Sequence, residues 1–107
     1  MEPTERIPIA ERRLEFSEKG KAERKPLKIR VFAPQPVDAG SVRFRVDADA
    51  SSCIVEFDGI PGANMGAIYG ADSIQALQLA VDIEPVLKRL SKHYDFYFPS
   101  GEGYFDE

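Results

Sequence analysis

The chain has 107 residues, of which 43% are hydrophobic and 30% charged, enough for one domain with a single core but not for two. The acidic net charge of −4 argues against a general affinity for nucleic acid, because such binding depends on neutralising phosphates. We expect neither a membrane helix, which needs about 18–20 apolar residues, nor a signal peptide in residues 1–16. The single cysteine cannot form an internal disulfide, which favours a cytoplasmic location.

The first two thirds of the chain are predicted to form strands. Residues 1–8 are polar, contain two prolines and are predicted to be a loose arm. Arg12 falls on the apolar side of the first strand, which indicates a sheet edge there. Short connections favour an antiparallel meander. Alternating apolar and polar residues predict strands at 9–17, 27–31, 42–46 and 53–57, and allow a brief fifth at 67–69.

Residues 70–94 hold the only long helical period in the sequence. Asp72 is the expected N-cap, and Gln75 stands three residues later to complete a capping box. Three cationic residues near the end suit the negative end of the helix dipole. The apolar arc predicted to face the core consists of Ala76, Leu79, Ala80, Ile83, Val86, Leu87, Leu90 and Tyr94.

Pro85 interrupts this pattern, because proline inside a helix removes a hydrogen bond and costs about 3 kcal/mol. The constant phase of the apolar arc favours a kink at Pro85. The alternative is a second helical segment that begins with Pro85 in its first turn.

The final residues, 94–107, hold six of the eleven aromatic side chains, including a short predicted strand at 95–99, so this tail should dock on the domain. The expected fold class is α+β. One domain, 1–107, would contain an antiparallel meander of four to five strands, one long C-terminal helix packed on one face, and a short aromatic tail.

Residues 70–80, GADSIQALQLA, resemble the helix start of an uncharacterised family of small bacterial domains, in which the pattern G-x-D-S-x-Q-A-L-x-L-A follows several strands. The Ala10-Glu11-Arg12 run before the first strand is similar as well. The chain departs from the family pattern at Pro85, and its tail matches loosely. The resemblance implies a bacterial source and an α+β domain, and it brings no activity.

No local motif indicates chemistry. Asp47 to Ser51 has the opening spacing of a calcium loop, but the flanking segments read as strands, and glycine is missing where Ser52 stands. The glycine-rich stretch at 59–70 lacks the G-K-[ST] of a phosphate loop. Cys53 and His93 are the only residues of their kinds, and both are expected to pack inertly. We assign no catalytic residue, cofactor or metal.

Charge is unevenly distributed along the chain. Residues 1–30 carry nine Lys/Arg against six Asp/Glu, whereas residues 31–107 carry five against twelve. Four cations lie on the outward side of two strands predicted to be neighbours: Lys28, Arg30, Arg43 and Arg45. They form either a solvated face, flanked by Glu15 on one side and by Glu56 and Asp58 on the other, or a patch that binds an acidic partner.

A second apolar stripe on the helix consists of Ile74, Leu77 and Val81, well away from the main arc. Something should cover these side chains. The candidates are the chain's own 59–70 loop, its 96–105 tail, or a second molecule, which would be a homodimer mate or a protein target.

Two hypotheses for function follow from these patterns. The first is a non-catalytic, cytoplasmic protein-interaction module, for example an inhibitor or immunity-type partner. The alternative is a small-ligand-binding protein or small enzyme whose pocket is walled by the aromatic tail. An exposed apolar patch would favour the first, and a concave pocket with carboxylates near Tyr97 or Tyr104 would favour the second.

Overall fold

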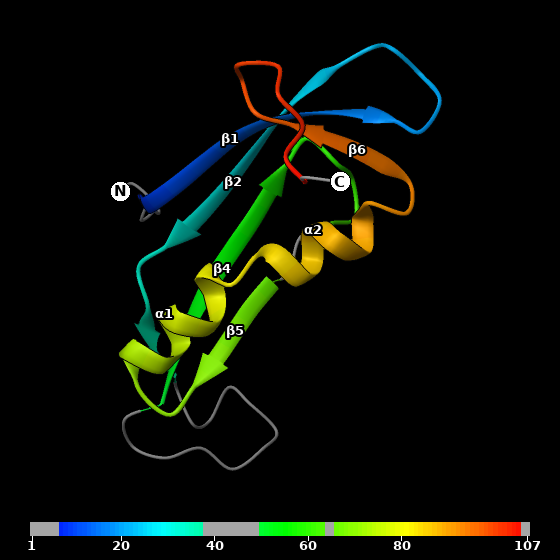
Figure 1. Ribbon diagram of the computed structural model, residues 1–107. Coiled ribbons are helices and arrows are strands. Elements are labelled where there is room, and N and C mark those ends of the chain that lie inside the picture. Colours follow the sequence, from blue (N-terminus) through cyan, green and yellow to red (C-terminus); the bar gives the residue numbers. More distant parts are fainter. Residues whose placement is uncertain (1–6, 38–49, 64–65, 106–107) are drawn as a thin grey trace.

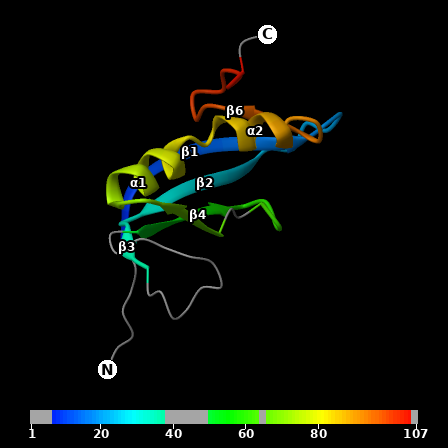
Figure 2. The ribbon, with the colours of Figure 1, turned by 90° about the horizontal axis from the view of Figure 1, so that it is seen from below.

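The computed structural model describes residues 7–37, 50–63 and 66–105, which form an α+β fold. Figures 1 and 2 show an antiparallel sheet with a bent helix on one face. Neither helical segment in the described residues has the length and apolar character needed to cross a membrane. The elements are β1 (Pro8–Glu18), β2 (Lys25–Phe32), β3 (Gln35–Pro36), β4 (Ser51–Asp58), β5 (Gly66–Gly70), α1 (Ser73–Val81), α2 (Glu84–Leu90) and β6 (Tyr94–Tyr97).

The strands pair antiparallel, β1 with β2, β2 with β4 and β4 with β5. The predicted meander placed the 42–46 strand between 27–31 and 53–57, whereas β2 and β4 are direct neighbours. The short β3 pairs with the start of β4, and β6 pairs antiparallel with the end of β1. The bent helix therefore carries the chain from β5 across the sheet to the side of β1 (Figure 1). The strand predicted at 42–46 lies outside the described residues.

The predicted alternation is confirmed in the central strands. Every second residue is buried from Leu27 to Val31 in β2 and from Cys53 to Phe57 in β4. In β1, Leu14 and Phe16 are buried, but residues 7–13 are exposed. Because β6 pairs only with Glu15 to Glu18, the first half of β1 has one described neighbour, β2. The edge position that Arg12 indicated is therefore confirmed.

The C-terminal helix is bent and divided into two segments, α1 and α2. Pro85 stands in the first turn of α2, where its missing N–H would have no partner. The Ile83 N–H donates a hydrogen bond to the Val81 carbonyl, with a nitrogen-to-oxygen distance of 2.9 Å. This bond closes a tight turn between the two segments. The preferred kink in a continuous helix is thus replaced by the alternative, a restart at Pro85.

The apolar arc of the helix is mostly confirmed. Ala76, Ala80 and three larger residues of the second segment are buried, whereas Leu79 is 49% exposed and contradicts the prediction. The physical reason is that α1 contacts the sheet narrowly, through alanines. A Cβ added at Gly70 in β5 would lie only 2.4 Å from the backbone nitrogen of Ala76, so α1 lies almost against the strand.

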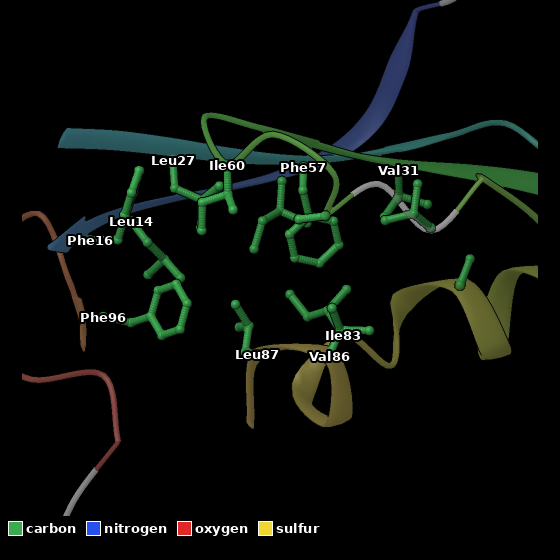
Figure 3. Close-up of a cluster of buried hydrophobic side chains, with 14 of the residues drawn as sticks. Leu14, Phe16, Leu27, Val31, Phe57, Ile60, Ile83, Val86, Leu87 and Phe96 are labelled. Atoms are coloured by element: carbon green, nitrogen blue, oxygen red, sulfur yellow. The ribbon is translucent and has the colours of Figure 1, made fainter. Parts of the chain in front are cut away.

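The core lies mainly under α2. Figure 3 shows Ile83, Val86 and Leu87 directed toward the large side chains of the sheet. Phe96 of β6 closes this cluster at one end. Burial of side chains of this size contributes about 1.5–3 kcal/mol each, so α2 and the strands beneath it hold most of the stabilising apolar contact.

The N-cap of α1 provides a first test. Asp72 Oδ1 accepts from the Gln75 N–H over 2.8 Å, and Gln75 Oε1 accepts from the Ala71 N–H over 2.6 Å. Asp72→Ala should lower the free energy of unfolding by about 0.5–2 kcal/mol in a urea titration, because the first turn loses its cap. Asp82→Ala, an exposed position after the end of α1, serves as the control. Equal midpoints for the wild type and Asp72→Ala would contradict this role of the cap.

The single cysteine provides a second test. Cys53 is fully buried, and its thiol donates to the Phe32 carbonyl over 3.0 Å. Burial raises the pKa of the Cys53 thiol, which reduces the reactive thiolate at neutral pH. Labelling with a thiol reagent should be slow in the native protein and fast in denaturant. Complete labelling of the folded protein within seconds would contradict the observed burial.

Candidate interaction surfaces and pockets

The second apolar stripe is largely uncovered. Ile74 is 68% exposed and Val81 is 49% exposed, whereas Leu77 is half-buried against the core. We call Ile74, Leu77 and Val81 the α1 face. The prediction that the chain's own loop or tail covers the stripe is therefore wrong for Ile74 and Val81. The tail instead folds over the β6 end of the molecule, beside α2 (Figure 1).

The ends of the α1 face are acidic. Asp72 precedes the helix and Asp82 follows it, and both are exposed. The nine residues of α1 include no lysine or arginine. A molecule that contacts this face would therefore meet apolar side chains between two carboxylates.

Of the predicted basic patch, Arg30 is paired with carboxylates of its own sheet. Lys28 and Arg30 lie on β2, which pairs with β1 on one side and with β4 on the other. Arg43 and Arg45 lie outside the described residues. The Arg30 side chain is only 22% exposed and pairs with three carboxylates. Its nitrogen-to-oxygen distances are 3.1 Å to Glu11, 2.7 Å to Glu56 and 3.2 Å to Asp58.

These pairs correct one predicted neighbour. Glu11, rather than Glu15, stands opposite Arg30 on β1, and Glu15 instead lies 3.9 Å from Arg24. Hydrogen bonding to Glu56 is the main cause that raises the pKa of Arg30. Hydrogen bonding to Arg13, together with the Arg30 contact, lowers the pKa of Glu11. Arg30 is therefore committed to its own sheet.

A cluster of three residues that the sequence did not indicate fixes the tail. Arg12 Nη1 donates to the Tyr104 hydroxyl oxygen over 2.7 Å and lies 3.4 Å from Glu84 Oε2. The Tyr104 hydroxyl donates to the same Glu84 carboxylate. Burial and this hydrogen bond raise the pKa of Tyr104, so its hydroxyl stays protonated at neutral pH. The one available signal was Arg12, a charged residue on the apolar side of its strand.

The tail is shaped by backbone hydrogen bonds. The Phe98 N–H donates to the Glu102 carbonyl and the Tyr104 N–H to the Phe96 carbonyl, both over 2.8 Å. This turn needs a positive φ of 100° at Gly101, which glycine adopts without strain. The chain thus folds back beside β6 and places Tyr104 and Phe105 next to the core.

Two open hollows lie near the end of α2, and Lys19 and Tyr94 line both of them. The hollow between the helix end and the aromatic tail, here called the tail pocket, has a volume of about 500 Å³. The other, next to Pro61, has about 520 Å³ and is lined in part by Lys92 and His93. The lining of the tail pocket comprises Lys19, Lys88, Ser91, Tyr94, Asp95, Phe96, Tyr97, Gly103 and Phe105.

The two rare residues do not form a site. Cys53 is fully buried in β4, whereas His93 is exposed after α2. Within the described residues, no three His, Cys, Asp or Glu side chains gather as metal ligands would. The Asp47 to Ser51 stretch lies mostly outside the described residues.

No protein-family model, curated protein or solved structure matches the chain. The resemblance of residues 70–80 to a bacterial domain family therefore stays a prediction.

The Arg30 network generates a test with a defined pH dependence. Arg30→Met should lower the melting temperature at pH 7, because three carboxylates lose their shared cation. The pKa of Glu11 is lowered below its usual value of 4.5 in the folded protein. The stability that the ionised Glu11 contributes is therefore present above pH 4.5 and is lost as the pH falls through the folded-state pKa.

The difference between wild type and Arg30→Met should consequently shrink when melting is measured at progressively lower pH. Lys28→Met removes a neighbouring cation of the same strand and serves as the control. A difference that grows toward low pH would contradict the assigned pairing.

Proposed function

We propose that this chain is a non-catalytic protein-interaction module whose α1 face contacts the partner. The observation that carries the proposal is the exposure of Ile74 and Val81 in a described helix. Burying an isoleucine or valine side chain contributes about 1.5–3 kcal/mol, and the fold leaves this contribution unused. A partner would gain it by covering the face, in the way that amphipathic helices are recognised.

The charges on α1 favour one kind of partner. Asp72 and Asp82 stand at the two ends of the face, and α1 supplies no cation to neutralise them. The complementary surface is a protein segment with apolar side chains flanked by lysine or arginine. An amphipathic helix with basic flanks has this chemistry, and it would also suit an inhibitor or immunity-type role.

The test compares two labelled helical peptides of equal hydrophobicity, one with basic flanks and one with acidic flanks. The basic peptide should bind more tightly in a fluorescence-anisotropy titration. Val81→Glu should weaken this binding by about tenfold or more, equivalent to about 1.4 kcal/mol. Gln78→Glu adds the same charge to the same helix without removing apolar area, and should retain binding.

Sedimentation of the wild type and of Val81→Glu tests whether a second copy of the chain, rather than a different protein, covers the α1 face. If the wild type self-associates through this face and the variant is monomeric, the occupant is a second copy, and the proposal of a basic heterologous partner fails. If neither peptide binds and neither variant changes association, the α1 face is not an interface.

A further inference from the structure

The tail pocket has the size of a small-molecule site. Its volume of about 500 Å³ falls within the roughly 300–1,000 Å³ of typical ligand pockets. It is bounded by the end of α2, by β6 and by the returning tail. Its lining residues belong to α2, β6 and the tail, whereas the α1 face lies on the other helical segment. Figure 1 shows β6 and the tail at the end of the molecule away from α1.

Aromatic rings form much of its wall, and other contacts hold them in place. Phe96 lies 6.4 Å from Phe105 and 6.5 Å from Tyr94, measured between ring centroids. Tyr94 packs edge-on against Phe16 at 5.5 Å. Phe105 packs edge-on against Tyr104 at 5.1 Å, and Tyr104 is itself fixed by the Arg12 and Glu84 contacts. A planar aromatic ligand would find edges and faces already arranged for it.

The charged residues of the lining favour an anion. Lys19 Nζ lies 2.7 Å from Asp95 Oδ1, so the one carboxylate among the described lining residues is already paired with a cation. Among the described lining residues, Lys88 is then the cation that has no carboxylate partner. The Ser91 hydroxyl donates to the Lys88 carbonyl over 2.6 Å, which ties down the helix end beside this lysine. An anionic group near Lys88 would form a charge-assisted hydrogen bond.

We propose that the tail pocket binds a small aromatic anion, a planar ring system that carries one carboxylate or phosphate. The ring lies against Tyr94 and Phe105, which are only partly buried, and the anionic group reaches Lys88. This site is separate from protein binding by the α1 face. It gives the aromatic tail the role of a pocket wall.

The test uses four naphthalene probes that differ in one substituent: 2-naphthoate, 2-naphthyl phosphate, neutral 2-naphthamide and cationic 2-naphthylmethylamine. Each is titrated into the full chain and followed by two-dimensional ¹H–¹⁵N NMR. The shift changes should concentrate at Lys88, Ser91, Tyr94 and Phe105. At least one anion should bind about tenfold more tightly than the amide, and the amine should bind more weakly than the amide. Which anion binds identifies the group the pocket accepts.

Two variants separate the charge from the wall. Lys88→Met should reduce the affinity for the anion to that of the amide. Lys92→Met removes the same charge near the same helix end but lines the other hollow, and it should bind like the wild type. Phe105→Ala should weaken the binding of the anion and of the amide by a similar factor. The melting temperature of this variant reports whether the fold is retained.

Equal binding of the anions and the amide would overturn the proposal, as would an unchanged affinity in Lys88→Met. Shifts centred on Lys92 and His93 would also overturn it, because they would place the ligand in the other hollow. None of these outcomes bears on the α1 face, whose test uses different variants and a different readout.

Discussion

The close contact between β5 and α1 sets the position of the whole helical layer. Only glycine fits at position 70, because a Cβ there would collide with the backbone of Ala76. Ala76 and Ala80 are fully buried and bring α1 close to β4 and β5, because the alanine side chains are small. A helix packed through alanines has a narrow contact area, so its larger apolar residues project beyond the sheet. The exposed α1 face is a direct consequence of this contact.

The second helical segment packs in a different way. Ile83, Val86 and Leu87 rest on bulky side chains of β1, β2 and β4 (Figure 3). Because the two segments pack through residues of such different size, a straight helix would fit the sheet less well than a broken one. Pro85 stands where the second segment begins. The direction of α2 in turn brings the chain to β1, where β6 can pair and the tail can return. The tail pocket thus depends on the bend.

Much of the fold could be predicted because its determinants are local. Period-two alternation identified the central strands from side chains two residues apart, and Asp72 with Gln75 identified the start of α1. The burial of Leu79 was predicted wrongly, because one helical phase was applied across both segments. The contact of Arg12 with Tyr104 spans 92 residues of sequence, and no local pattern encodes a contact of that kind. The same holds for the tail pocket, which joins residues from the turn after β1, from α2, from β6 and from the tail.

The half-covered first strand has a consequence for how copies of the chain meet. β6 pairs only with Glu15 to Glu18 of β1. The earlier part of β1 therefore has β2 as its one described neighbour. An open strand edge is a template on which another chain can add a strand. Here that stretch carries Glu11, Arg12 and Arg13 in succession, and two copies aligned edge to edge would have to bring these charges together. The charged side chains of this stretch, including the arginine that anchors the tail, therefore make the open edge a poor template for another strand.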